Sequence, residues 1–355
     1  MASAVLSSLG LFPLIVIFAA AAGAIWIAGI HLSNTTDVLS NRLHLGEALG
    51  GLILLAVATN LPELAITVSA ARAHNLGIAI GNILGGIAIQ TVVLALLDGL
   101  GIRAQPLMYR AASLVLLLEA ALVVPLLVIV IMGTQLSPDV IYARVTPPEL
   151  AIVAFWLAGL WLIGHARRGL PWHEAGNPPD GQAGPRGMAQ AIKDEQHSEK
   201  STARVVTVFS AAALATLAAG VVLEESGSEI ADHIGLSGVL FGATVLAAAT
   251  ALPEVSTGLA SVRLGDYQLA VSDIFGGNAF LPILFLVASL VSGDAVLPQA
   301  ANSDIYLTGL GVLLTVIYIW SIIFRPRRQW ARLGPDSILV VIVYVVAIAG
   351  LLAVT

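Results

Sequence analysis

The sequence contains no cysteine among its 355 residues, and only 11% of the residues are charged. The absence of cysteine excludes disulfides, thiolate metal sites and cysteine catalysis. So small a charged fraction, with 58% hydrophobic residues and a mean hydropathy of +0.93, is not that of a soluble globule. No nucleophile elbow, P-loop or HExxH motif occurs, and nothing indicates a resident cofactor or nucleic acid. We therefore predict a membrane protein that is not an enzyme.

Long apolar runs dominate what is present. A bilayer core about 30 Å thick is crossed by about 20 apolar helical residues, and ten runs meet that test. They cover residues 11–31, 46–72, 76–99, 112–133, 149–165, 204–223, 236–262, 268–292, 304–324 and 336–354. The runs are long and continuous, which predicts helices and not barrel strands. The first run lacks a basic flank and a cleavage site, so we expect it to be retained. The predicted fold class is an all-α membrane protein with ten transmembrane helices.

The positions of the basic residues predict an orientation. With the N-terminus outside, all of the 16 Lys and Arg residues except Arg72 and Arg144 fall on the cytoplasmic side. Arg far outnumbers Lys, and Ala and Gly are abundant, which is typical of a bacterial protein from a GC-rich genome. We therefore expect a multi-pass protein of the bacterial inner (plasma) membrane, with its central loop in the cytoplasm.

The chain repeats itself on either side of a polar segment. Residues 166–203 are rich in Gly and Pro and lack helical periodicity, which predicts a cytoplasmic linker between residues 1–165 and 204–355. A shift of 191 residues aligns T-N-L-P-E at 59–63 with T-A-L-P-E at 250–254 without a gap. Five spans in each half orient the two halves oppositely, as in transporters built from inverted repeats with a site near the midplane.

Both T-x-L-P-E segments place a proline and a glutamate midway along an apolar run. Because proline lacks an N–H, Pro62 and Pro253 each free the carbonyl four residues earlier. With the carboxylate and the Thr hydroxyl and carbonyl, each half offers four oxygen sources, and Ca²⁺ takes about six to eight oxygen ligands. A carboxylate at the bilayer centre costs about 2.5–3.5 kcal/mol. The pair therefore predicts a cation site between Glu63 and Glu254.

The charge of this site predicts exchange. Two facing carboxylates repel, and a divalent cation, two monovalent cations or protons would each relieve the repulsion. An empty dianionic site would cross the dry interior at prohibitive cost, whereas a loaded site can pass. We therefore expect obligatory exchange of ions and no leak.

Further polar residues lie near this pattern. Asn82 and Asp273 are equivalent in G-N-I-L-G-G and S-D-I-F-G-G, and Gln90 follows Asn82 by two helical turns. Asp273 is either a proton carrier near the site or a structural partner, and Gln90 faces either the same cavity or a neighbouring helix. The double glycines favour close helix approach over direct binding. Glu119, in the fourth span, has no counterpart that can be aligned. An acidic group, expected in a solvated outer loop, comprises Glu224, Glu225, Glu229 and Asp232.

The paired T-x-L-P-E segments, each followed by G-N or S-D and then Gly-Gly, resemble the α-repeats of the calcium:cation antiporter superfamily, which are sodium/calcium exchanger-like. The resemblance covers both repeats and all ten spans. It implies exchange of Ca²⁺ for Na⁺, H⁺ or K⁺ by alternating access. The cation ligands that it implies are Glu63, Glu254, Thr59, Thr250 and the carbonyls of Ala56 and Ala247.

The chain departs from the family pattern at several hydroxyl positions. Sodium-coupled members carry Ser where this chain has Asn60 and Ala251, and again where it has Gly86 and Gly277. Fewer hydroxyls for separate Na⁺ sites favour proton coupling. The residues left for a supporting or proton-carrying role are Asn60, Asn82, Gln90, Asp273 and Asn278.

The resulting hypothesis is an antiporter for Ca²⁺ or a related cation, driven by H⁺ or Na⁺. The alternatives are a monovalent cation/proton exchanger, a channel, and a descendant that no longer transports. The expected partners are inorganic cations and the lipid bilayer.

Overall fold

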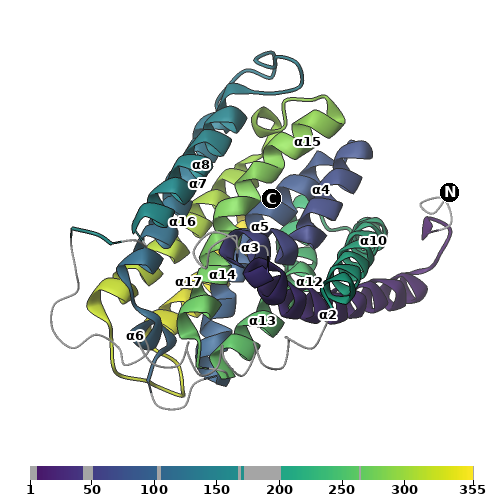
Figure 1. Cartoon of the computed structure of the whole chain (residues 1–355). Helices are drawn as coiled ribbons and strands as arrows, with labels where there is room; N and C mark the ends of the chain where they lie inside the picture. The colour runs from purple at the N-terminus through teal and green to yellow at the C-terminus, as the bar shows by residue number, and fades with distance from the viewer. Residues whose placement is uncertain are drawn as a thin grey trace.

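The computed structural model describes residues 6–42, 51–101, 105–166, 169–171, 201–263 and 265–354, and these form helices joined by short connections (Figure 1). The first half contains α2 Leu11–Arg42, α3 Gly51–Thr59, α4 Leu61–Arg72, α5 Leu76–Gly101, α6 Leu107–Ala111, α7 Leu114–Thr134 and α8 Pro147–Ala166. The second half contains α10 Thr202–Ile234, α11 Gly238–Phe241, the π-helix η2 Gly242–Leu246, α12 Ala247–Thr250, α13 Leu252–Arg263, α14 Tyr267–Phe280, the 3₁₀-helix η3 Leu281–Ile283, α15 Leu284–Ser292, the 3₁₀-helix η4 Leu297–Gln299, α16 Asn302–Phe324 and α17 Pro335–Val354.

These helices confirm the predicted all-helical membrane fold. Eight helical stretches within the described residues are long and apolar enough to cross a membrane, and a shorter apolar helix covers Pro335–Leu351. The predicted run 46–72 begins outside the described residues and continues as α3 and α4, which are separate helices. Most of the predicted linker 166–203 also lies outside the described residues, so the domain division stays a prediction.

The acidic group expected in a loop lies on a helix instead, so that prediction was wrong. The first helix of the second half continues beyond its apolar run to Ile234 and ends at Gly235, which has a left-handed φ of 69°. Glu224 is buried there, and it accepts a hydrogen bond of 2.7 Å from the Ser69 hydroxyl of α4. Polar residues beyond the bilayer do not break a helix, so α10 continues past residue 223, where the apolar run ends.

The central helix of the bundle is α5. In the apolar stretch of α5, 83% of the residues are buried, compared with 22% in that of α10. It contacts helices of both halves, including α4, α13, α16 and α17. The long helices α2 and α10 pack along each other and lie side by side, away from α7 and α8 (Figure 1). Residues of both halves share one apolar core around α5, exemplified by Ile83 and Phe285.

Close helix contacts at glycine explain the tight packing around α5. A Cβ atom on Gly81 would stand 2.7 Å from the backbone oxygen of Val239, and one on Gly85 would collide with the backbone of Ala243. The expectation that glycine permits close approach is thus confirmed at Gly85, which packs on the π-helix η2.

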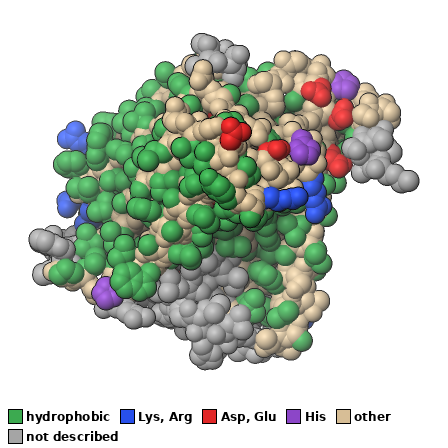
Figure 2. All heavy atoms as spheres, turned by 90° about the horizontal axis from the view of Figure 1, so that it is seen from above, with side chains coloured by type: hydrophobic (Ala, Val, Ile, Leu, Met, Phe, Trp, Pro, Cys, Tyr) green, Lys and Arg blue, Asp and Glu red, His purple; other side chains and the backbone are tan. Residues whose placement is uncertain are grey.

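The outer surface is apolar. Large exposed side chains include Phe12, with 77% of its surface exposed, and Phe324, with 80%. Seen from above, hydrophobic side chains cover much of the molecule, and acidic side chains gather on one part of it (Figure 2). Such a surface suits contact with lipid, because soluble monomers rarely expose large apolar patches.

Candidate cation site

The two T-x-L-P-E segments each interrupt a helix at the same point. Asn60, with φ −88° and ψ 14°, separates α3 from α4, and the equivalent Ala251, with φ −76° and ψ 1°, separates α12 from α13. Pro62 and Pro253 take the second position of the following helices. The missing N–H of proline is tolerated in a first turn. The prolines therefore begin new half-helices at mid-span.

This local structure puts both glutamates at helix N-termini. Glu63 lies in the first turn of α4 and Glu254 in the first turn of α13, and neither side chain is exposed. The N-terminus of a helix carries partial positive charge and unused N–H groups, which favour an anion. The backbone thus offsets part of the cost of burying two carboxylates.

Both glutamates meet at one amide group. The Nε2 atom of Gln90, on α5, lies 3.4 Å from Oε1 of Glu63 and 3.3 Å from Oε1 of Glu254. The acids of the two repeats therefore converge as the repeat predicted, and Gln90 faces the same place. The bridging position of Gln90 was not predicted, because its equivalent in the second repeat is Leu281.

The threonines reach across the repeats. The Thr250 side chain interacts with the Glu63 carboxyl, and the Thr59 side chain with the Glu254 carboxyl. Their hydroxyls also contact the carbonyls of the preceding turn, Thr59 with Ala56 at 3.3 Å and Thr250 with Ala247 at 3.2 Å. Each hydroxyl thus lies between a carbonyl of its own helix and a carboxyl of the other repeat, and its oxygen can also offer lone pairs to a cation.

The first repeat contains an additional amide beside its glutamate. Asn60 Nδ2 donates to the Ala56 carbonyl at 2.6 Å, and Asn60 Oδ1 accepts from Gln90 Nε2 at 3.1 Å. Gly277 of α14 provides the space for these two amides, because a Cβ atom there would lie 2.9 Å from Asn60 Nδ2 and 3.2 Å from Gln90 Oε1. In the second repeat Ala251 provides no such group.

Three buried oxygens at this point have no hydrogen-bonding partner. They are Oε2 of Glu63, Oε2 of Glu254 and Oε1 of Gln90. A buried polar atom without a partner costs about 1–3 kcal/mol. The two carboxylate oxygens among them can bind a hard cation or protons.

The other predicted residues lie around this centre. Asp273 is buried, accepts a hydrogen bond of 2.7 Å from Thr257, and acts electrostatically on Glu254. Asn278 donates a hydrogen bond of 2.9 Å to the Thr91 hydroxyl. Neither side-chain atom of the buried Asn82 has a partner. No cluster of three or more Asp, Glu or His side chains in the described part of the chain could hold a metal, so neutral oxygens would have to complete the site.

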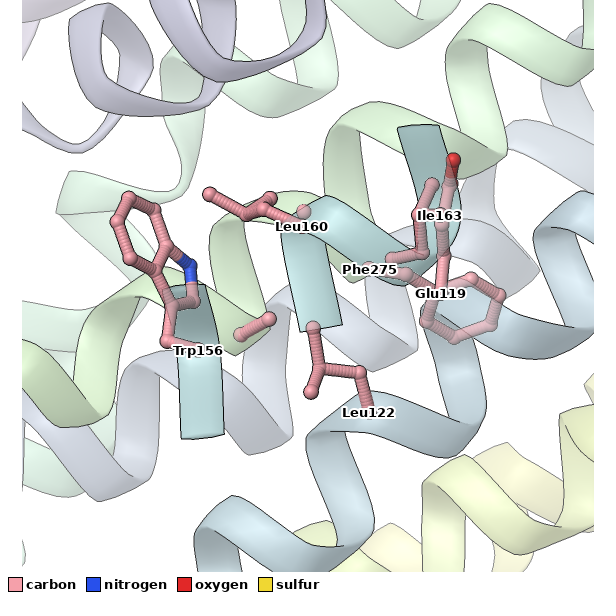
Figure 3. A pocket seen from close by; sticks show the side chains of 8 residues that line it. Glu119, Leu122, Trp156, Leu160, Ile163 and Phe275 are labelled. Carbon is pink, nitrogen blue, oxygen red and sulfur yellow. The ribbon is translucent and has the colours of Figure 1, made fainter. Parts of the chain in front are cut away.

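A separate pocket lies between α7, α8 and α14, and Glu119 lies beside it (Figure 3). Its lining residues are Glu119, Leu122, Trp156, Leu160, Ile163, Phe275, Gly276 and Ala279. The buried Glu119 accepts a hydrogen bond of 2.5 Å from Ser272, the residue before Asp273. This hydrogen bond from the second repeat explains how the Glu119 carboxyl can be buried, although Glu119 has no counterpart in the second repeat.

Comparison with known proteins identifies the family. The profile described as sodium/calcium exchanger protein matches residues 13–166 and 203–353. The chain belongs to the sodium/calcium exchanger family. The inner membrane protein YrbG of Escherichia coli strain K12 is 24% identical over 282 residues, covering 78% of this chain and 80% of YrbG. The putative antiporter CaxA of Alkalimonas amylolytica is 26% identical over 287 residues, covering 79% of this chain and 82% of CaxA.

Solved exchanger structures share the fold. The H⁺/Ca²⁺ exchanger CAX superposes with a TM-score of 0.66 at 13% identity, over 96% of this chain and 86% of CAX. The sodium-calcium exchanger NCX_Mj superposes with a TM-score of 0.58 at 16% identity, over 96% of this chain and 99% of that protein. The resemblance to the calcium:cation antiporter superfamily and the exchanger-like fold are thereby confirmed.

Proposed function

We propose that this membrane protein exchanges Ca²⁺, or a related divalent cation, for protons by alternating access, with Glu63 and Glu254 as shared ligands. One observation carries the proposal. Two fully buried carboxylates, one from each repeat, converge on a single amide, and each keeps one oxygen without a hydrogen-bonding partner.

The available oxygens match the cargo. Two carboxylates and the hydroxyls of Thr59 and Thr250 supply oxygen ligands of the kind that Ca²⁺ prefers. The carboxylates carry two negative charges, which one divalent cation or two protons would neutralise. A neutral loaded site can cross the apolar interior, and the dianion cannot.

Protons are the proposed counter-ion because the neutral oxygens around the carboxylates are few. Ala251, Gly86 and Gly277 provide no hydroxyls for separate Na⁺ sites. Proton exchange at the glutamates needs no further ligand. The superposed proteins are described as an H⁺/Ca²⁺ exchanger and a sodium-calcium exchanger, which supports cation exchange in general and does not decide the counter-ion.

The proposed setting is the bacterial inner membrane, with the N-terminus outside. Residues 166–203 would be a cytoplasmic linker between repeats 1–165 and 204–355. The distribution of Lys and Arg supports this orientation. The description of YrbG as an inner membrane protein supports the location.

Uptake by reconstituted vesicles tests the proposal. Purified protein is placed in liposomes, and ⁴⁵Ca²⁺ uptake is measured with a pH gradient or a Na⁺ gradient imposed separately. We expect uptake driven by the pH gradient, and its loss in Glu63→Gln and in Glu254→Gln. Asp139→Asn, which changes an exposed loop acid, is the matched control and should transport normally.

Each alternative has its own outcome. Uptake driven by Na⁺ alone would overturn proton coupling, and Na⁺/H⁺ exchange without Ca²⁺ uptake would favour the monovalent exchanger. Currents that need no counter-ion would indicate a channel. Absence of all fluxes in the folded parent protein would indicate a descendant that does not transport.

A further inference from the structure

The loop before the last helix of each repeat recurs in sequence and in backbone conformation. Residues 142–149 read Y-A-R-V-T-P-P-E and residues 330–337 read W-A-R-L-G-P-D-S, at a shift of 188 residues. In both loops the first and fourth residues form an isolated antiparallel β-bridge. The Ala and Arg between them have positive φ, 49° and 64° in the first loop and 51° and 71° in the second. Positive φ is uncommon outside glycine, so its recurrence marks one local structure used twice.

The first loop ends in a buried acid that contacts the other repeat. Glu149, in the first turn of α8, accepts a hydrogen bond through Oε1 from the hydroxyl of Ser289 on α15. Its Oε2 accepts from the Thr146 N–H at 2.8 Å, and Ser289 Oγ accepts from the Val296 N–H at 3.3 Å. This contact joins the last helix of the first repeat to the second repeat.

The second loop makes the reciprocal contact. Asp98, fully buried near the end of α5, accepts through Oδ2 from the Gly334 N–H at 2.6 Å and from the Ser337 hydroxyl at 2.8 Å. Its Oδ1 accepts from the Leu107 N–H at 2.7 Å. This contact joins the first repeat to the last helix of the second. No ion pair to Asp98 or Glu149 occurs among the described residues, so N–H and hydroxyl donors stabilise both acids.

The two contacts are equivalent with acid and serine exchanged. A shift of 191 residues relates Asp98 to Ser289, and the loop shift of 188 relates Glu149 to Ser337. We call the pairs Asp98–Ser337 and Glu149–Ser289 the two clamps. The loop between α7 and α8 lies at one end of the molecule, and α6, which follows α5, lies toward the other (Figure 1). Each end of the bundle thus has one clamp between repeats.

The clamped helices also carry residues of the candidate cation site. Gln90 lies eight residues before Asp98 on α5, about 12 Å along a helix that rises 1.5 Å per residue. Asp273 and Gly277 precede Ser289 on α14 and its continuation, α15. A contact that holds the end of each helix also fixes the position of that helix along the bundle. It therefore sets the height of the Gln90 amide and of Gly277 relative to the two glutamates.

We propose that Asp98, Ser337, Glu149 and Ser289 are positioning residues, and that both clamps stay closed throughout the transport cycle. In this arrangement α5 moves with α17, and α15 moves with α8, each pair as one piece. The statement about the cycle rests on the proposed exchange activity. The positioning role does not, because cation binding and folding report it without transport.

Cross-linking tests whether the clamp opens. The chain has no native cysteine, so Asp98→Cys with Ser337→Cys, joined by a short bis-thiosulfonate reagent, gives one defined link. We expect the linked protein in vesicles to keep the Ca²⁺ uptake of the same variant before linking. Uptake that disappears on linking and returns on reduction would overturn the proposal. The single-cysteine variants treated identically are the controls.

An exchange of acid and serine covers the case in which the cysteine variant does not fold or transport. Asp98→Ser leaves the N–H groups of Leu107 and Gly334 without their acceptor, so we expect a lower melting temperature and weaker Ca²⁺ binding. Adding Ser337→Glu rebuilds the arrangement of the first loop and should recover much of both losses. If the losses of melting temperature and Ca²⁺ affinity in the double variant equal the sum of the losses in the two single variants, the two clamps are not equivalent and the proposal is overturned. If the clamp recovers stability and binding while parent and variants all lack uptake, the exchange proposal alone fails.

Discussion

The two halves of the cation site share their acids and differ in their amides. Each half provides a helix break, a proline in the new first turn, a buried glutamate and a threonine that reaches the glutamate of the other half. Only the first half adds Asn60 and Gln90, where the second has Ala251 and Leu281. In the proposed exchanger, the symmetric groups would bind the divalent cation. The asymmetric amides determine what the carboxylates contact when no cation is bound.

The largest effect is expected when Gln90 is replaced by leucine, the residue that occupies the equivalent position, 281, in the second repeat. Gln90→Leu removes the amide donor shared by both carboxylates, so the ion-free protein should lose about 1–3 kcal/mol of stability. Ca²⁺ should restore most of the loss, because it replaces the donor. Melting curves in detergent at a fixed alkaline pH, with and without Ca²⁺, measure the difference. Leu281→Met, which removes no donor, is the control. Equal stabilisation by Ca²⁺ in Gln90→Leu and the parent would show that Gln90 does not substitute for the cation.

The glycines at equivalent positions should respond differently to the same change. Gly277→Ala places a methyl group against the amides of Asn60 and Gln90, and we expect about tenfold weaker Ca²⁺ binding, or about 1.4 kcal/mol. Gly86→Ala meets only the flexible end of Leu281, at 3.3 Å, and should bind Ca²⁺ like the parent. Calorimetric titration of both variants gives the comparison. Similar losses in the two would contradict the placement of the amides at Gly277.

The threonines, in contrast, should behave alike. Thr59→Val and Thr250→Val each remove one hydroxyl beside the glutamate of the opposite repeat. A hydrogen-bonding group of this kind contributes about 1 kcal/mol, which corresponds to roughly a fivefold change in Ca²⁺ affinity. The same titration applied to both variants tests their equivalence. A large loss in one and none in the other would place the cation in a single half.

The amino-acid sequence predicted most of the fold because an apolar run of membrane-spanning length needs no tertiary information to be recognised. It predicted the ends of α2 and α10 poorly, since those helices continue past their apolar runs to Arg42 and Ile234. The break at Asn60 was anticipated only as a consequence of Pro62. Helix geometry shows that the proline begins a new helix.

The site was predictable where the two repeats agree. Glu63 and Glu254 recur at one fixed shift, so their meeting followed from the inverted arrangement. Gln90 has no counterpart in the second repeat. Helical spacing indicates which face of the helix it occupies but not which residues of other helices it meets, so its contact with both acids could not be predicted. The clamps were missed because their loops align at a shift of 188 residues, and an ungapped shift of 191 conceals them.

The smallest effect is expected at Asn60. Asn60→Ala copies the second repeat and has two opposing consequences: Gln90 loses an acceptor, while the Ala56 carbonyl loses the donor that stands 2.6 Å away and becomes available to a cation. The net change in Ca²⁺ affinity should stay within about threefold, or about 0.6 kcal/mol. Titration of Asn60→Ala beside the parent decides between two roles. A loss of Ca²⁺ affinity well beyond threefold would mean that the asparagine contacts the cation directly, whereas a change within threefold means that it orients the glutamine.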